Sequence, residues 1–251
     1  MTERLTTTLA RILVAAALFA LWEALSRSGL INPSLLPAAS DTLRTLGELL
    51  QRGSVRNDLA VTASEVLAAF ALAVPFGCLV GFLIAENRYF AEVVKPLLFF
   101  AFSIPKSIFL PMFILVFGVG FSEKVGFGFF STIFIVIMST TTAVESVKLE
   151  YLTVARSYGA TPAQTAFRVY LPSMLPVLLE ALRISMIFNL TGVILAEMYA
   201  SRDGIGHQIA TWGENFQMPQ LLAGVVIVAA IAILFNEMVR WAEARCSHWR
   251  T

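Results

Sequence analysis

Charged residues are scarce in this sequence: Asp, Glu, Lys and Arg together make up 14% of its 251 residues. Soluble globular domains carry about 25% charged residues, whereas 57% of this chain is hydrophobic and its mean hydropathy is +0.76. This composition excludes an ordinary water-soluble domain and allows several membrane spans of about 20 residues each. The formal net charge is only +1, so nothing favours nucleic acid as a partner.

Groups that carry out chemistry are also scarce. The two cysteines, Cys78 and Cys246, do not indicate a disulfide framework. The sequence has no phosphate-binding glycine loop ending in Gly-Lys-Ser/Thr, and no paired His, Cys and carboxylate cluster. We therefore predict no catalytic, metal-binding or cofactor-binding residue and no complete enzyme. Any ATP-driven step needs another polypeptide to bind the ATP and its magnesium.

Long apolar runs are abundant, and they predict six membrane spans. These are Ala10–Leu25, Val66–Ala85, Leu97–Phe117, Val125–Val144, Pro176–Met198 and Leu221–Trp241. Each must be helical, because backbone groups that face lipid have no water to bond. The first run lacks a convincing small-residue cleavage site, so we expect a retained span rather than a signal peptide. The predicted fold is all-α, with residues 1–251 forming one transmembrane domain.

A shorter amphipathic segment lies between the first two spans, at about residues 40–52. Its apolar residues fall at helical spacing beside charged ones: Leu43, Leu46, Leu49 and Leu50 alternate with Asp41, Arg44 and Glu48. This pattern predicts a helix that lies along the membrane surface.

Positive charge near the span ends predicts the orientation, because cytoplasmic loops carry an excess of Lys and Arg. With the N-terminus inside, the inner side holds Arg4, Arg11, Arg88, Lys95, Lys148, Arg156, Arg168, Arg183, Arg240, Arg245 and Arg250. The outer side holds the smaller set Arg27, Arg44, Arg52, Arg56, Lys124 and Arg202. Both termini and the polar segment 147–172 are therefore expected in the cytoplasm.

That polar segment, Val147–Pro172, begins with a stripe of residues at helical spacing: Val147, Tyr151, Val154 and Tyr158. Gly159 follows, where a helix C-terminus commonly needs a left-handed residue. Thr161, Pro162 and Gln164 then have the pattern of an N-cap, a first-turn proline and a capping box.

We therefore predict a helix–turn–helix elbow, whose second helix carries the apolar stripe Ala163, Ala166, Phe167 and Tyr170. Pro172 is expected to prevent clean continuation into the next span. The elbow either docks into a groove on a partner, as amphipathic helices do, or is a solvated loop packed on its own bundle.

The elbow resembles the cytoplasmic EAA loop of binding-protein-dependent ABC importer permeases. That loop reads Glu-Ala-Ala, three residues, Gly, nine residues, then Ile-x-Leu-Pro, and this chain has matches at Ala155, Gly159, Val169, Leu171 and Pro172. Three more stretches look like the nitrate/sulfonate/taurine branch of these permeases: "INPSLLPAASDTL", "LPMFILVFGVGFSEK" and "ILAEMYASRDGIGHQI".

The resemblance implies a type I importer permease fold in a bacterial inner membrane. It implies that the elbow inserts into a cleft of an ATP-hydrolysing subunit through Tyr151, Val154, Ala155, Tyr158, Gly159, Ala160, Phe167, Leu171 and Pro172. The implied partners are a second permease copy that forms a homodimer with this chain, two ATP-binding subunits, an extracytoplasmic solute-binding protein and membrane lipid. The branch handles small anions such as nitrate, sulfonates and taurine, and also some heterocycles.

The chain departs from the family pattern at two places. Thr153 stands where the motif has Glu, and Glu150 lies one turn earlier. The branch tends to carry an Arg-Pro pair where this chain has Phe102-Ser103, and Lys106 stands where a proline is common. Since Phe102 and Lys106 are four residues apart, a continuous helix would place both on one face, and the positive charge would have moved by one turn.

Polar groups inside spans are costly, so they mark candidate positions along a solute path. Lys106 with Ser103 is either part of an anion path or a structural pair. Ser185 and Asn189 lie on a stripe that serves either helix packing or the path. The last group of candidates consists of Glu197, Asp203, Gly204 and Gly206. By resemblance this group is the outer gate and binding-protein docking region. The alternative is a glycine turn beside a solvated acid.

These observations together predict the membrane-spanning permease subunit of an ATP-driven importer for a small, anionic solute. The alternative is a secondary transporter or a channel that works without an ATPase. Such transporters usually show internal repeats, and we find none that is convincing.

Overall fold

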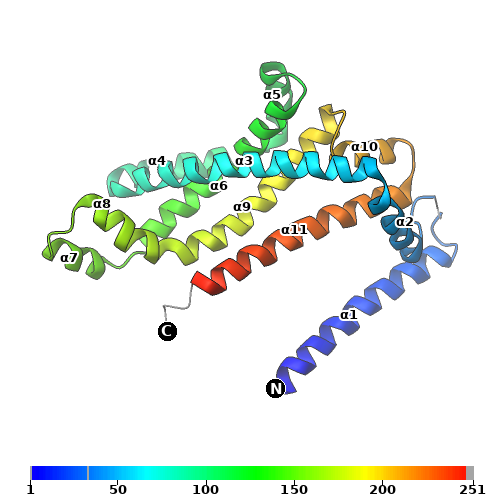
Figure 1. The fold of residues 1–251 in the computed structure, drawn as a ribbon, viewed down its shortest axis with the longest axis horizontal. Helices are drawn as coiled ribbons and strands as arrows, with labels where there is room; N and C mark the ends of the chain where they lie inside the picture. The colour runs from blue at the N-terminus through cyan, green and yellow to red at the C-terminus, as the bar shows by residue number, and fades with distance from the viewer. Residues whose placement is uncertain (1, 33, 247–251) are drawn as a thin grey trace.

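The computed structural model describes residues 2–32 and 34–246, and every regular element in these ranges is helical. Their order, shown in Figure 1, is α1 (Thr2–Arg27), α2 (Ala39–Gln51), α3 (Gly53–Glu86), α4 (Arg88–Ser103), the 3₁₀ turn η1 (Lys106–Phe109), α5 (Leu110–Phe117), α6 (Phe121–Glu145), α7 (Leu149–Ser157), α8 (Pro162–Thr165), the π-helical turn η2 (Ala166–Tyr170), α9 (Leu171–Ala200), α10 (Ile205–Glu214) and α11 (Met218–Cys246). The all-α prediction is confirmed. Pro33 of the second matched motif, Arg250, and the side chains of Arg4 and Cys246 lie outside the described residues.

Five helices in the described chain are long and apolar enough to cross a membrane. They cover Leu9–Arg27, Gly53–Glu86, Phe121–Glu145, Pro162–Ala200 and Met218–Trp241. A sixth crossing results if the bent pair Arg88–Ser103 and Lys106–Phe117 is counted as one span. Each of the six predicted spans falls on one of these segments, although three of them differ in detail from the prediction.

The predicted third span is not a continuous helix, because the chain turns by 78° between α4 and η1. Ile104 is extended, with φ −71° and ψ 128°, immediately before Pro105. A proline disfavours the helical conformation of the residue that precedes it, which explains the break at this point. Pro111 lies in the first turn of α5, where a proline fits a helix without interrupting it. Lys106 therefore begins a new helical segment rather than continuing α4.

The predicted stop at Pro172 is wrong, since one helical run extends from Pro162 to Ala200. The π-helical turn η2 lies just before the proline, and the amide of Leu171 donates to the carbonyl of Ala166. This wider turn shifts the hydrogen-bond register, so that the ring and the missing N–H of Pro172 interrupt no regular α-helical ladder. The elbow is consequently joined to α9 without a flexible break.

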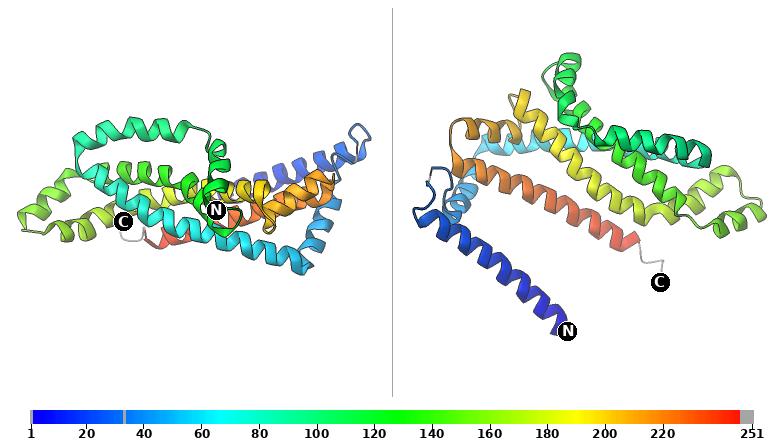
Figure 2. Two further views of the ribbon diagram at one scale, coloured as in Figure 1. Left: turned by 90° about the horizontal axis from the view of Figure 1, so that it is seen from above. Right: turned by 180° about the vertical axis from the view of Figure 1, so that it is seen from behind.

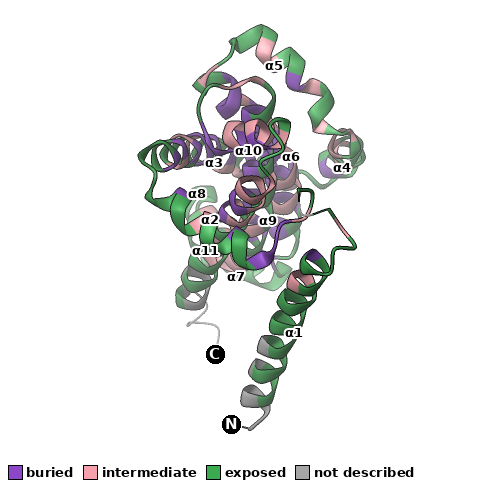
Figure 3. Ribbon diagram, turned by 90° about the vertical axis from the view of Figure 1, so that its right-hand side faces the viewer, coloured by how far each residue is buried: buried purple, intermediate pink, exposed green. Residues whose placement is uncertain are grey.

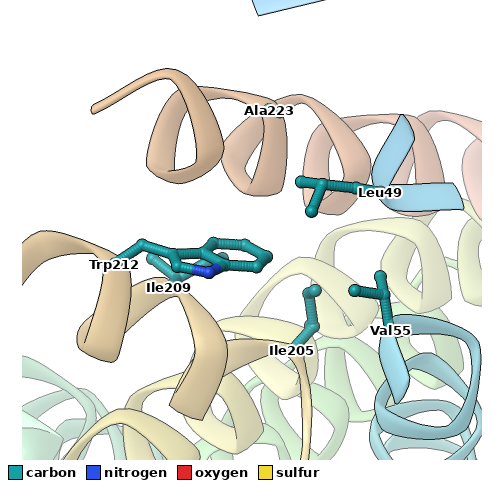
Figure 4. Packing of buried hydrophobic residues seen from close by; sticks show 6 residues of the cluster. All are labelled: Leu49, Val55, Ile205, Ile209, Trp212 and Ala223. Atoms are coloured by element: carbon teal, nitrogen blue, oxygen red, sulfur yellow. The ribbon is translucent and has the colours of Figure 1, made fainter. Parts of the chain in front are cut away.

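The second span also begins earlier than predicted, because α3 starts at Gly53. The amphipathic segment before it forms α2 as expected, and α2 packs against α11. Its Leu49 is fully buried in the cluster drawn in Figure 4, together with Val55, Ile205, Ile209, Trp212 and Ala223. Leu43 and Leu50 are exposed. The position of α2 on the membrane surface stays a prediction.

The centre of the bundle is formed by α3, α6 and α9, which contact one another along their lengths. Small residues allow this close approach: a Cβ on Gly192 of α9 would lie 2.6 Å from Ser131 Oγ of α6. Helix α1 differs, because it extends away from the bundle and its surface is mostly exposed, as Figure 3 shows.

The two ends of the bundle carry different elements. In Figure 2, α7 and α8 lie at the same end as the C-terminal end of α11, whereas α2 and α10 lie at the other end. Helix α6 ends beside α7, and α9 ends just before α10. We refer to these as the elbow end and the α10 end.

Candidate functional site

The elbow has the local geometry that its sequence predicts. Gly159 has φ +71°, and its amide donates to the carbonyl of Arg156 at 3.0 Å while the amide of Ala160 donates to that of Ala155 at 3.0 Å. These two bonds form the Schellman arrangement that ends a helix. The capping box of α8 is also present, because Gln164 N donates to Thr161 Oγ1 at 3.3 Å and Thr161 N donates to Gln164 Oε1 at 2.9 Å.

The outer surface of the elbow is apolar and exposed. Tyr151, Val154, Tyr158 and Phe167 all belong to it, and Tyr158 is 88% exposed. Leu152, on the opposite side of α7, is buried and anchors the helix to the rest of the chain. Val147 is buried and precedes α7, so its predicted place in the helical stripe with Tyr151, Val154 and Tyr158 is wrong. The elbow thus presents a surface that its own bundle does not cover.

The two halves of the elbow enclose a hollow of about 330 Å³. Its lining residues are Tyr151, Val154 and Ala155 from α7, and Arg168, Val169, Pro172 and Ser173 from η2 and α9. Leu171 is exposed beside it, and Ala160 is half-buried in the turn. Of the predicted docking residues, Tyr151, Val154, Ala155 and Pro172 line this hollow, and the others belong to the elbow outside it.

A second candidate site lies at the bend between α4 and η1. A cavity of about 400 Å³, the Lys106 cavity, is lined by Phe102, Ser103, Ile104, Pro105, Lys106, Ser107, Phe127, Ser131, Phe188, Thr191, Gly192 and Leu195. The sequence identified Ser103 and Lys106, which belong to one segment. It missed the hydroxyls of Ser131 and Thr191, which α6 and α9 bring to the same cavity and which no local pattern marks.

The Lys106 ammonium is held against aromatic rings rather than against a carboxylate. Its Nζ lies 4.2 Å from the ring centroid of Phe102, 5.9 Å from that of Phe188 and 6.0 Å from that of Phe134. Nζ also donates to the carbonyl of Phe102 at 3.2 Å. None of the described carboxylates forms an ion pair with Lys106. The helix-face argument for Phe102 and Lys106 fails at the break, yet the bend brings the two side chains together.

Ser185 and Asn189 lie elsewhere. Both are fully buried, and the amide oxygen of Asn189 lies near Gly128 of α6, where a Cβ would be 3.4 Å from it. Ser185 Oγ donates to the carbonyl of Leu182 on its own helix at 2.9 Å. Neither residue lines the Lys106 cavity: Asn189 lies at the contact between α9 and α6, and Ser185 is buried on α9.

At the α10 end, the predicted acid of α9 is buried rather than solvated. Glu197 Oε1 accepts from Thr62 Oγ1 at 2.6 Å, and Oε2 accepts from the amide of Gly206 at 2.7 Å. Gly204 has φ +101°, and a Cβ there would lie 2.1 Å from Glu197 Oε1. Its amide donates to Asp58 Oδ1 at 3.0 Å. This turn is therefore locked to α3 and α9, while Asp203 stays exposed at its tip.

A buried ion pair lies near this turn, between Glu65 of α3 and Lys124 of α6, with Nζ 3.0 Å from Oε1. Both side chains are at most 5% exposed. The sequence counted Lys124 as an outer-surface charge and did not predict the pair. The available signal was the position of both charges at the margins of apolar runs.

Comparison with known proteins decides the family. The model of the "binding-protein-dependent transport system inner membrane component" family matches residues 73–248. The chain belongs to this family. It is 27% identical over 239 residues to the taurine transport system permease protein TauC of Escherichia coli, covering 93% of this chain and 87% of that protein. It is 26% identical over 239 residues to the putative aliphatic sulfonates transport permease protein SsuC of Bacillus subtilis, covering 95% and 87%.

A solved structure of the MetNI methionine ABC transporter in an inward-facing conformation shares the fold, with a TM-score of 0.61 at 20% identity, covering 86% of this chain and 98% of that one. The predicted membership of the nitrate/sulfonate/taurine branch is thus confirmed, and so is the importer permease fold. The chain is a multi-pass inner-membrane permease subunit of an ABC importer. The alternative of a transporter or channel outside this family is not retained.

Proposed function

We propose that this permease carries a small organic anion, such as a sulfonate, along a path that includes the Lys106 cavity. The observation that carries the proposal is the Lys106 ammonium, which lies at the bend of the apolar pair Arg88–Ser103 and Lys106–Phe117 and has no carboxylate partner among the described residues. An uncompensated charge in this setting is costly and commonly belongs to a substrate pathway. The taurine and sulfonate permeases among its relatives support the same solute class.

The lining of the cavity suits an organic anion better than a bare oxyanion. Ser107 and Ser131 offer hydroxyl donors for an anionic head group, whereas Ser103 Oγ and Thr191 Oγ1 donate to the carbonyls of Phe99 and Ile187. Phe127, Phe188 and Leu195 supply apolar surface for a carbon skeleton. A compact, strongly hydrated anion would have to exchange its water shell for these few donors, whereas an organic anion places only its head group among them.

The driving force is proposed to enter at the elbow. Two ATP-binding subunits, which hold the ATP and its magnesium, would bind the hollow surface formed by α7 and η2 from the cytoplasmic side, on which both termini would also lie. Because η2 continues into α9 without a break, displacement of the elbow would move α9 as a rigid body. Helix α9 in turn lines the Lys106 cavity through Phe188 and Thr191.

The opposite end is proposed to meet an extracytoplasmic solute-binding protein. The turn at Asp203–Gly206 joins α9 to α10 and is held by hydrogen bonds to Glu197 and Asp58. A movement of α9 would therefore be transmitted through this turn to the outer surface. A second copy of this chain would complete the path, since the Lys106 cavity opens on the surface of a single subunit.

The anion proposal is tested with Lys106→Met and Lys106→Arg, assayed as the full transporter in proteoliposomes with its ATP-binding subunits and solute-binding protein. Met keeps much of the side-chain length without the charge, whereas Arg keeps the charge. We expect Lys106→Met to lower uptake about tenfold, the effect of about 1.4 kcal/mol, and Lys106→Arg to retain uptake. Wild-type kinetics in the Met variant, with intact assembly, would contradict the proposal.

A further inference from the structure

A second cavity adjoins the Lys106 cavity and shares a wall with it. This Ser139 cavity has a volume of about 490 Å³ and lies between α4, α6 and α9, where its lining includes Phe102, Ser139, Thr142 and Glu180. Phe102 is the one residue that lines both cavities. Four consecutive hydroxyl residues of α6 divide here: Ser139 and Thr142 line this cavity, whereas Thr140 and Thr141 are buried.

The two cavities follow one another along the bundle axis. From Ser131 to Ser139 on α6 the rise is roughly 12 Å at about 1.5 Å per residue. Along α9 the order is the same, since Thr191 lines the Lys106 cavity and Glu180 lines the Ser139 cavity. The Ser139 cavity is therefore the one nearer the elbow end.

The charges of the two cavities differ. Lys106 has no carboxylate partner in the described chain. The lysine of the Ser139 cavity, Lys95, forms an ion pair with Glu145, and the carboxylate of Glu180 also lines this cavity. An anion is thus attracted to the Lys106 cavity, whereas the Ser139 cavity offers it hydroxyls without an unpaired cation.

The shared wall is aromatic. The ring of Phe102 packs edge-on against Phe188 of α9, with centroids 5.5 Å apart and planes at 65°. The same ring lies under the ammonium of Lys106. Phe102 thus contacts the charge of one cavity and lines the other, and its partner Phe188 belongs to the helix that continues from the elbow.

We propose that Phe102, packed on Phe188, is a partition between a binding station for an organic anion at Lys106 and a release chamber at Ser139. The inference rests on the proposed anion transport and adds a direction to it. Movement of α9 separates Phe188 from Phe102, and the solute passes from the charged station to the chamber that does not retain it.

Cysteine accessibility tests the partition without relying on transport. Thr191→Cys and Ser139→Cys are introduced singly into full-length chain in which Cys78 and Cys246 are replaced by Ser, assembled with the ATP-binding subunits. Thr191 lines the Lys106 cavity and is exposed, so burial alone does not slow its labelling. A membrane-impermeant thiol reagent added at the elbow side is expected to label Ser139→Cys much faster than Thr191→Cys. Adding Phe102→Ala should bring the two labelling rates together. Equal rates while Phe102 is present would overturn the proposal.

Passive efflux of a radiolabelled alkyl sulfonate from preloaded proteoliposomes gives a second readout. We expect Phe102→Ala to raise ATP-independent efflux roughly tenfold, the equivalent of about 1.4 kcal/mol. Phe102→Leu, which keeps apolar bulk, should stay near the wild-type rate. The control is Phe100→Ala on the same helix, because Phe100 is exposed and lines neither cavity.

The outcomes separate this inference from the function on which it rests. If Lys106→Met imports normally but the labelling contrast across Phe102 holds, the anion station is wrong and the partition stands. If efflux in Phe102→Ala equals that in Phe100→Ala, and labelling does not change, the partition is wrong whatever Lys106 does. A Phe102→Ala chain that fails to assemble is replaced by Phe102→Val, which is judged by the same two readouts.

Discussion

The elbow turn provides the sharpest prediction, because its glycine can be changed without touching any neighbour. Gly159 has φ +71°, and a Cβ built there meets nothing within 4 Å. Gly159→Ala therefore adds only backbone strain, about 1–2 kcal/mol for an L-residue in the left-handed conformation. Gly159→Pro is more severe, because proline fixes φ near −65° and removes the N–H that bonds Arg156 at 3.0 Å.

The consequence of each change should be confined to the elbow. We expect Gly159→Ala to leave assembly intact and to weaken coupling modestly. Gly159→Pro should re-aim α7 relative to η2, so that ATP is hydrolysed without solute transport. The assay compares ATP hydrolysis with uptake for the whole transporter in proteoliposomes. Gly53→Pro cannot serve as control because it alters a helix start, whereas Gly47→Ala can, because Gly47 is an exposed position of α2 with open space around it. A normal transport-to-hydrolysis ratio in Gly159→Pro would refute the reasoning.

Two further predictions concern the bundle. Lys124→Met leaves the Glu65 carboxylate buried without its counter-charge and should lower the free energy of unfolding by about 3–5 kcal/mol, seen as a lower Tm in detergent. The double variant with Glu65→Gln should recover most of this loss. An unchanged Tm in the single variant would exclude a stabilising pair. Gly192→Ala pushes α9 away from α6 and should lower the free energy of unfolding by about 1–3 kcal/mol. Gly47 has open space around it, so Gly47→Ala should be neutral or should stabilise the fold by about 0.5–1 kcal/mol. Equal Tm values for these two variants would contradict the close helix contact.

Local features were predictable from the sequence. The capping box at Thr161 and Gln164 and the left-handed turn at Gly159 depend on residues within a few positions, so their patterns identify them directly. The effects of prolines were less predictable. Pro105 breaks its segment, Pro111 starts a helix and Pro172 is absorbed by a π-helical turn, because each outcome depends on the register of the neighbouring hydrogen bonds.

Contacts between distant segments could not be predicted. Thr62 and Glu197 are 135 residues apart, and their hydrogen bond requires α3 and α9 to pack in one particular register. The Lys106 cavity shows the same limit, since Ser103 and Lys106 are sequence neighbours but Ser131 and Thr191 join them only through packing. A single sequence indicates which face of each helix is apolar, but it does not indicate which helix faces pack against each other.

Site-directed cross-linking tests most directly whether the exposed elbow is where an ATP-binding subunit engages this permease. A cysteine at Tyr158, which is 88% exposed on the elbow, is compared with one at Leu30, which is 82% exposed in the loop after α1. In the assembled transporter, Tyr158→Cys is predicted to cross-link to the ATP-binding subunit, with a yield that changes on adding ATP, and Leu30→Cys is predicted not to. Cross-linking from Leu30→Cys alone would contradict the account.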